Sequence, residues 1–408
     1  MNEELILKNG IKVYQINEEK FHEVYLSLKI VFKLESRTNT IANLLTRMMG
    51  DRLIENPTKT SLAQRHDMLY GAKTSALTYT LGTYQVIDLG IKMIHERFTN
   101  ESLLDQQIKL LKDMYLYPLL SEQTLEEAKK NLRISHMHIK ENASQNALVK
   151  SFKYAGEGQL FGLSAFGDLE DLDTITLAEI QNFHTRCIQE FNKQIYLVGG
   201  IDRECNFDAF TVGHSMPINE ALLKTKITNA YLEERYKGSQ SELVCVYETS
   251  ITPYDDLYYA YLVFIAYLGQ LPTSLLFQNI REKHSLCYSI YASRQVYDGI
   301  FYIATGVSDK NVEKAISLID EQFDLIREEP LDLKAAINYL DLSLEGNTER
   351  IKSIADHTFR NNMLEVNESI ESMQEKIRAV TEADVKAVLE KITKPFIFAY
   401  RGETNENN

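Results

Sequence analysis

A short internal repeat constrains the fold of this chain more than any other feature. Residues 175–180 read Ile-Thr-Leu-Ala-Glu-Ile, and residues 380–385, about 205 positions later, read Val-Thr-Glu-Ala-Asp-Val. In each copy a threonine is placed to cap the start of a helix, and each helix leads into a β-rich segment that closes with glycine. A chain of 408 residues is also long for one hydrophobic core. The repeat therefore predicts two similar domains.

Both halves of the chain mix strand and helix patterns in the same order. Alternating residues at 24–34 predict a strand, and apolar residues at helical spacing predict a helix that stops before Pro118. In the second half, strands are predicted on either side of the Asp298-Gly299 turn, and a helix follows at 312–327. We expect an α+β fold of two homologous domains, each an antiparallel sheet packed with helices.

The domain boundaries are expected in the middle of the chain. Residues 1–220 would form the first domain and residues 239–408 the second, with a linker at 221–238 that is rich in charged and polar residues.

Composition excludes several functional classes. A formal charge of −14 and a pI near 5.2 would repel a phosphate backbone, so no nucleic-acid partner is expected. The longest apolar run, Leu257–Leu268, is too short for a membrane span and is expected to form a buried helix. The opening Met-Asn-Glu-Glu lacks the features of a secretory signal peptide, so a cytoplasmic protein is expected. The cysteines have no C-x-x-C spacing, which predicts reduced thiols at Cys187, Cys205, Cys245 and Cys287.

One stretch in the second half resembles a known signature. Residues 275–289 read Leu-Leu-Phe-Gln-Asn-Ile-Arg-Glu-Lys-His-Ser-Leu-Cys-Tyr-Ser. This is similar to the pattern L-F-x-x-I-R-E-K-x-G-L-x-Y of the inverzincin peptidases, which include pitrilysin, insulin-degrading enzyme and the mitochondrial processing peptidases. The chain departs from that pattern at Ser285, where glycine is usual. The resemblance covers nearly the whole chain through the duplicated domains, and it implies that they form a half-clamshell.

The resemblance assigns roles to two residues. In active members of the family, an arginine and a tyrosine seven positions apart reach a zinc site in the other half of the enzyme. The tyrosine donates a hydrogen bond to the developing oxyanion, and the arginine holds the substrate backbone or the same charge. By position these roles fall on Arg281 and Tyr288. Each good donor of this kind is worth roughly 3 kcal/mol of transition-state stabilisation.

The metal-binding motif of the family is missing. That motif is H-x-x-E-H on a helix of the first domain, where two histidines one turn apart bind zinc and the glutamate activates a water. The matching helix places Asn43 and Arg47 at the histidine positions and Thr46 at the glutamate position. Arg47 keeps its proton and would repel a cation, and Thr46 cannot act as a general base. These positions are therefore expected to be degenerate.

No other cluster replaces the missing ligands. The third ligand of the family aligns with Ala128, although a shift of one residue would offer Glu127. The only close histidine pair, His136 and His138, is two positions apart on a predicted helix and should diverge. We expect no metal in this chain, and zinc in a partner.

Three functions remain open at this stage. The first is a substrate-binding, non-catalytic subunit of a peptidase heterodimer that acts on unfolded peptides with a zinc-bearing paralogue. Bacterial pairs of this kind are associated with peptide maturation, and one with modification of elongation factor P. The second is an inactive scaffold or peptide-binding protein. The expected protein partner is the zinc-bearing paralogue or, alternatively, a second copy of this chain in a homodimer. The third is a self-sufficient metallopeptidase, which Arg47 argues against.

Overall fold

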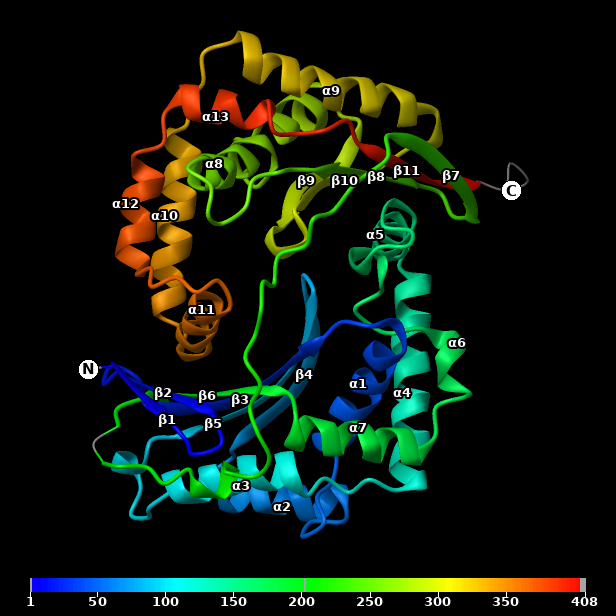
Figure 1. Ribbon diagram of the computed structural model, residues 1–408. Coiled ribbons are helices and arrows are strands. Elements are labelled where there is room, and N and C mark those ends of the chain that lie inside the picture. The colour runs from blue at the N-terminus through cyan, green and yellow to red at the C-terminus, as the bar shows by residue number, and fades with distance from the viewer. Residues whose placement is uncertain (1, 202, 404–408) are drawn as a thin grey trace. The chain divides into compact units, whose positions relative to one another are not determined.

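The computed structural model describes residues 2–201 and 203–403, which form two compact units, each built around one sheet (Figure 1). The first unit comprises Met1–His136, Ala165–Ala221 and Thr348–Glu365. The second comprises Met137–Ser164, Leu222–Asn347 and Val366–Asn408. None of the helices in the described part of the chain combines the length and apolarity needed to traverse a bilayer.

The sheet of the first unit has six strands in the order β1-β2-β6-β3-β5-β4. Strands β2 and β6 pair in parallel, and the other neighbours are antiparallel. The strands are β1 (Asn2–Ile6), β2 (Lys12–Asn17), β3 (Glu23–Lys33), β4 (Lys73–Leu81), β5 (Tyr84–Ile94) and β6 (Asn192–Gly199).

The sheet of the second unit repeats this arrangement with five strands in the order β7-β11-β8-β10-β9. Strands β7 and β11 are again the parallel pair. The strands are β7 (Ala230–Lys237), β8 (Ser241–Glu248), β9 (Cys287–Gln295), β10 (Ile300–Val307) and β11 (Phe396–Glu403). The matching order confirms the prediction of an α+β fold with two similar sheets.

The helices also follow the same order in the two halves. In the first half they are α1 (Ser36–Met49), α2 (Lys59–Met68), α3 (Leu104–Leu116), α4 (Glu122–Glu141), α5 (Ala143–Ala155), α6 (Leu169–Leu172) and α7 (Leu177–Gln189). In the second half they are α8 (Tyr258–Gly269), a π-helical turn at Phe277–Lys283, α9 (Val312–Glu328), α10 (Lys334–Thr348), α11 (Ile351–Met363), α12 (Ile370–Arg378) and α13 (Glu382–Leu389).

The repeated threonines cap equivalent helices. Thr176 begins α7 with a capping box: its hydroxyl accepts the backbone N–H of Glu179, whose carboxylate accepts the N–H of Thr176 at 2.9 Å. Thr381 and Asp384 make the same two bonds at the start of α13. The Asp384 carboxylate accepts the backbone N–H of Thr381 at 2.9 Å. Each box satisfies two N–H groups that a helix start leaves unpaired.

One helix of each half belongs to the unit of the other half. Helix α5 packs on β8, β10 and β11 of the second unit, whereas α11 packs on β3 and β6 of the first. The compact units are therefore discontinuous in sequence. Strand β7 lies within 221–238, the segment that the sequence predicts to be a linker, because its mostly exposed side chains hide the strand pattern.

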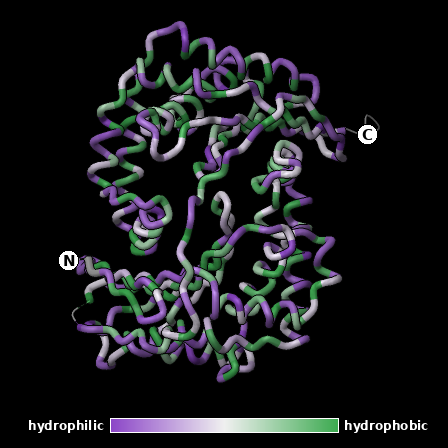
Figure 2. Tube along the Cα trace, in the orientation of Figure 1, coloured by the Kyte–Doolittle hydropathy of each residue, from purple (hydrophilic) through white to green (hydrophobic). Residues whose placement is uncertain are grey.

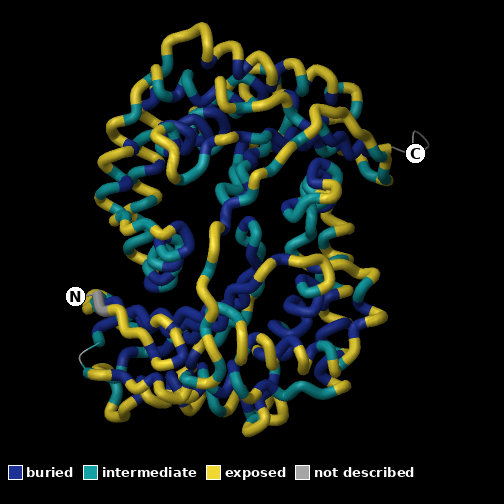
Figure 3. The backbone as a smooth tube through the Cα atoms, viewed as in Figure 1, coloured by how far each residue is buried: buried dark blue, intermediate teal, exposed yellow. Residues whose placement is uncertain are grey.

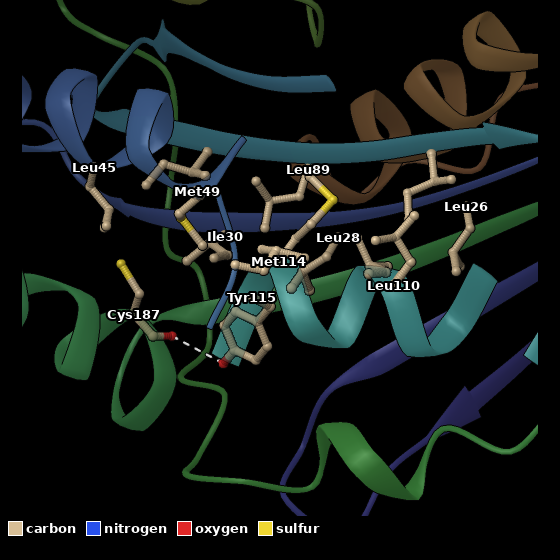
Figure 4. Packing of buried hydrophobic residues seen from close by; sticks show 14 of the residues in the cluster. Leu26, Leu28, Ile30, Leu45, Met49, Leu89, Leu110, Met114, Tyr115 and Cys187 are labelled. Atoms are coloured by element: carbon tan, nitrogen blue, oxygen red, sulfur yellow. Dashed lines mark hydrogen bonds between the residues drawn. The ribbon is translucent and has the colours of Figure 1, made fainter. Parts of the chain in front are cut away.

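Helices cover both faces of the first sheet, which accounts for its composition. Helix α11 lies on one face and α3 on the other (Figure 1). Strands β3 and β5 are consequently buried along almost their whole length, shown as dark blue tubes in Figure 3. Hydrophobic and hydrophilic residues alternate along the surrounding helices (Figure 2), as expected for elements with one buried face. Leu28, Leu89 and Met114 meet in this core (Figure 4).

A buried charge network holds α11 on the first sheet. The ammonium group of Lys29, whose side chain is fully buried, lies 2.8 Å from Asp88 and 2.9 Å from Asp356 of α11. Lys352 of α11 reaches the same Asp88 oxygen at 2.9 Å. Burial alone would raise the pKa of Asp88, but the two ammonium groups hold it below its usual value. The network therefore joins two central strands to a helix from the far end of the chain.

Removing the central charge should destabilise the first unit. We expect Asp88→Asn to lower the free energy of unfolding by about 3–5 kcal/mol, because it leaves the buried Lys29 ammonium without its main partner. Asp356→Asn is the matched control: this side chain is 44% exposed, so its loss should cost about 1 kcal/mol or less. Urea unfolding of the three proteins checks this, and equal losses in both variants would contradict it.

A second buried carboxylate, Asp298, has no cation paired with it among residues 2–201 and 203–403. It lies in the turn before β10, next to Gly299 at φ 63°, and burial raises its pKa to about 6. Because the folded-state pKa lies above the unfolded value, the contribution of this group to stability is fully present below about pH 4. That contribution is lost as the pH rises through about 6.

Replacing Asp298 with a neutral isostere should stabilise the protein at high pH. We expect Asp298→Asn to raise the free energy of unfolding above pH 6 by as much as about 3 kcal/mol, with a much smaller gain near pH 4. Unfolding curves at pH 4.5 and pH 8 measure the difference. A gain that does not change with pH would show that the Asp298 charge is not its cause.

Candidate functional site

Asn43, Thr46 and Arg47, the residues at three of the expected metal-site positions, lie on α1, and their side chains form hydrogen bonds within the protein. The amide nitrogen of Asn43 donates to the backbone oxygens of Asn39 and Ala165, both at 3.1 Å. The Thr46 hydroxyl donates to the Ala42 carbonyl at 2.7 Å. Both side chains are almost completely buried. The Asn43 amide nitrogen is thus committed to oxygens around α1, and its uncharged amide oxygen is a weak ligand for zinc.

Arg47 places a positive charge between α1 and α4. Its guanidinium donates to the Asn43 carbonyl at 3.1 Å and to the Ser135 hydroxyl of α4 at 3.3 Å. Burial lowers the pKa of this guanidinium from its usual value, but an arginine still remains charged. A zinc ion would meet a fixed cation here, so the residues present do not fit the metal.

The α4 side offers no replacement ligand. Ala128 is buried two helical turns before Ser135, on the face that meets Arg47. Glu127 is turned away from it and forms ion pairs with Arg52 and with Lys59, the latter at 3.3 Å. Among residues 2–201 and 203–403, no group of three or more His, Cys, Asp and Glu side chains is placed to hold a metal ion.

The histidines and cysteines of the first half make structural contacts. His136 bonds to the carbonyl of Phe166 at 3.1 Å, whereas His138 lies 3.8 Å from Glu141. His184 bonds to the Tyr115 carbonyl at 2.7 Å, and burial raises the pKa of the neighbouring Cys187 thiol to about 12. None of these groups is therefore placed to act as a nucleophile with its base.

The structure brings Arg281 and Tyr288 together at the surface of the second unit. Arg281 lies in the π-helical turn and Tyr288 is the second residue of β9, an edge strand. The Arg281 guanidinium lies 4.2 Å from the centre of the Phe277 ring and 5.7 Å from that of Tyr288. Tyr288 is 85% exposed, the highest value among the large hydrophobic residues that are exposed. The pair is held in place from one side and open to solvent on the other.

A strained turn connects the two residues. Ser285 has φ 50°, a left-handed conformation in which a side chain costs roughly 1–2 kcal/mol. Its backbone N–H bonds to the Arg281 carbonyl at 3.0 Å, and the next N–H, of Leu286, bonds to the Ile280 carbonyl at 3.3 Å. The turn that ends the helix and aims Tyr288 therefore needs the conformation that glycine adopts most easily.

Glycine at this position should relieve the strain. We expect Ser285→Gly to raise the free energy of unfolding by up to about 1 kcal/mol, since the relief exceeds the entropy that glycine adds to the unfolded chain. Ser285→Val should lower it by about 1–2 kcal/mol, because a β-branched residue is disfavoured at positive φ. Thermal unfolding compares the stabilities of the two variants with that of the original protein. A valine variant that is more stable than the original would contradict the prediction.

Sequence reasoning missed part of this site. Phe277 supports Arg281 from four residues earlier, and this spacing on a helix was a signal that could have identified the contact. The wider π-helical turn and the exposure of Tyr288 had no signal in the sequence.

Comparisons with known proteins agree with the resemblance. The family described as "Peptidase M16 inactive domain" matches residues 174–340. A Bacillus subtilis protein described as "Probable inactive metalloprotease YmfF" is 25% identical over 415 aligned positions, which cover 96% of each chain.

Solved structures share the fold over nearly the whole chain. A conserved protein from Enterococcus faecalis has a TM-score of 0.91 at 22% identity, with both chains fully covered. A peptidase M16 inactive domain from Pseudomonas fluorescens has a TM-score of 0.83 at 18% identity, also with full coverage. A protease from Helicobacter pylori has a TM-score of 0.81 at 15% identity, covering 98% of this chain and 99% of that one. Residues 174–340 therefore match the peptidase M16 inactive domain, and the chain as a whole is similar in sequence to a probable inactive metalloprotease and in fold to M16 proteins.

Proposed function

We propose that this chain is the non-catalytic, substrate-binding subunit of a zinc peptidase heterodimer. A zinc-bearing paralogue would supply the metal and the general base, and this chain would supply Arg281 and Tyr288. The observation that carries the proposal is the 85% exposure of Tyr288 beside an arginine that is held on Phe277. A tyrosine with only a packing role would be buried, whereas one that acts on a partner must be exposed.

The chemistry of the pair suits a developing negative charge. A phenol donates one hydrogen bond and a guanidinium donates several, and neither needs to change its protonation state to do so. Stacking on Phe277 and the tight turn at Ser285 limit the freedom of both groups before substrate arrives. Preorganised donors stabilise an oxyanion more than mobile ones, because no reorganisation occurs during the reaction.

The position of Tyr288 also suits an unfolded peptide. Strand β9 is at the edge of its sheet and carries Tyr288 near its start. An extended peptide that added to this edge would run past the tyrosine. Of the two substrate roles that the resemblance implies, peptide maturation uses such an extended chain directly, and modification of elongation factor P remains the alternative.

The two donors should affect turnover and not assembly. The tagged full-length chain is co-purified with its zinc-bearing paralogue, and cleavage of a quenched fluorogenic peptide is measured. We expect Tyr288→Phe and Arg281→Ala each to lower kcat by about tenfold or more, with the heterodimer intact. Tyr291→Phe is the matched control, since this tyrosine is on the same strand and 37% exposed, and it should change kcat little.

Two results would count against the proposal. If turnover is unchanged in both variants, the chain acts as a scaffold and its pair makes no contact with the transition state. If the purified chain alone cleaves the peptide and a chelator stops it, the chain is a metallopeptidase in its own right.

A further inference from the structure

A groove on the second unit is not explained by the Arg281–Tyr288 pair. It has a volume of about 340 Å³ and lies between α9, the turn from α13 to β11, and Asn229 just before β7. Phe323 and Leu389, both almost completely buried, contribute its apolar lining. Asp320 of α9 and Lys394 of the turn contribute charges.

The equivalent place in the first unit is filled by the chain itself. Since the two sheets have the same strand order, the counterpart lies between α3, the turn from α7 to β6, and the residues just before β2. The segment 205–214 occupies it. Phe207 and Phe210 are 2% and 0% exposed, and the Phe210 ring stacks on Tyr115 of α3 with 6.2 Å between centroids.

Polar contacts fasten this segment on two sides, and the Tyr115 ring of α3 packs against it on the third. Asn9, just before β2, donates from its side chain to the Phe210 carbonyl at 3.0 Å. The N–H of His214 donates to the Gln189 carbonyl at 2.9 Å, and the Lys193 ammonium donates to the His214 carbonyl at 2.7 Å. Tyr115 itself donates to the Cys187 carbonyl at 3.4 Å (Figure 4). In the first unit, therefore, this surface is covered by an aromatic peptide segment, residues 205–214.

In the second unit the described residues up to Glu403 leave the counterpart open. Tyr247 lines the groove with its side chain only 3% exposed, and its hydroxyl has no hydrogen-bond partner in residues 203–403. A buried hydroxyl without a partner is costly, so this group favours an occupant that brings an acceptor.

We propose that this groove binds an aromatic peptide segment from another polypeptide, seated as 205–214 is seated in the first unit. A phenylalanine of that segment packs on Phe323 and Leu389, and a backbone carbonyl accepts from Tyr247. Asp320 and Lys394, which line the groove with opposite charges that attract each other, select segments that carry both charges. The site is separate from the proposed peptidase function and does not depend on it.

The probe is a fluorescein-labelled synthetic peptide of residues 203–215 of this chain, with Cys205→Ser to prevent oxidation. We expect saturable binding to the full-length protein by fluorescence anisotropy. Asp320→Trp, which fills the groove, should weaken binding by about tenfold or more. Glu321→Trp is the matched control, because the adjacent acidic residue is exposed on the same helix but does not line the groove. The chain has no native tryptophan, so the emission of the introduced residue also verifies that each variant is folded.

A second peptide separates aromatic recognition from charge. The same peptide with Phe207→Ser and Phe210→Ser should bind at least about tenfold more weakly. Absence of saturable binding up to about 1 mM would overturn the proposal. So would equal binding of the two peptides, which would indicate attraction by charge alone. Binding that survives Asp320→Trp would place the peptide elsewhere, for example on the first unit in exchange for its own segment 205–214, and would overturn the proposal as well.

Discussion

Each sheet of this chain depends on a helix that comes from the other half of the sequence. Strands β3 and β5 are buried almost throughout, so they require cover on both faces, and α11 supplies one of these layers for the first sheet. Ion pairs hold this helix in place. The ammonium group of Lys29 is completely buried, and its charge is compensated by Asp88 and by Asp356 of α11. In the second unit, Lys150 of the exchanged helix α5 pairs with Glu234 and lies 4.8 Å from the centre of the Tyr400 ring.

The side chains at the expected metal positions of α1 have structural roles in this chain. The side chains of α1 that would face a metal now satisfy backbone carbonyls and bridge to α4 through Ser135. The same helix also packs into the core of the first unit through Ala42, Leu44 and Leu45. Arg281 and Tyr288, by contrast, lie at the surface, where Arg281 packs on the Phe277 ring and Tyr288 is largely exposed.

Local sequence patterns predicted much of the fold. The features that depend on contacts between residues far apart in the sequence could not be predicted from it. The threonine caps at 176 and 381, the Asp298-Gly299 turn and the strand at 24–34 depend on neighbours within a few residues, and the structure has them. The exchange of α5 and α11 depends on contacts hundreds of residues apart, and β7 carries a charged sequence that looks like a linker. At the site, sequence identified the missing metal motif and the Arg281–Tyr288 spacing. The groove beside Tyr247 required the comparison of two folded units, because its lining residues are scattered from 229 to 397.

The exchanged helices also bear on the origin of the chain. A protein made of one repeat would have had a sheet with one bare face, and its own helix would have been positioned to cover a neighbour's sheet. In two such copies, the helix of each would cover the bare sheet face of the other, which is the arrangement of a domain-swapped dimer. The present chain makes that exchange within one polypeptide. Either half of the sequence by itself would therefore lack the exchanged helix that packs on its own sheet.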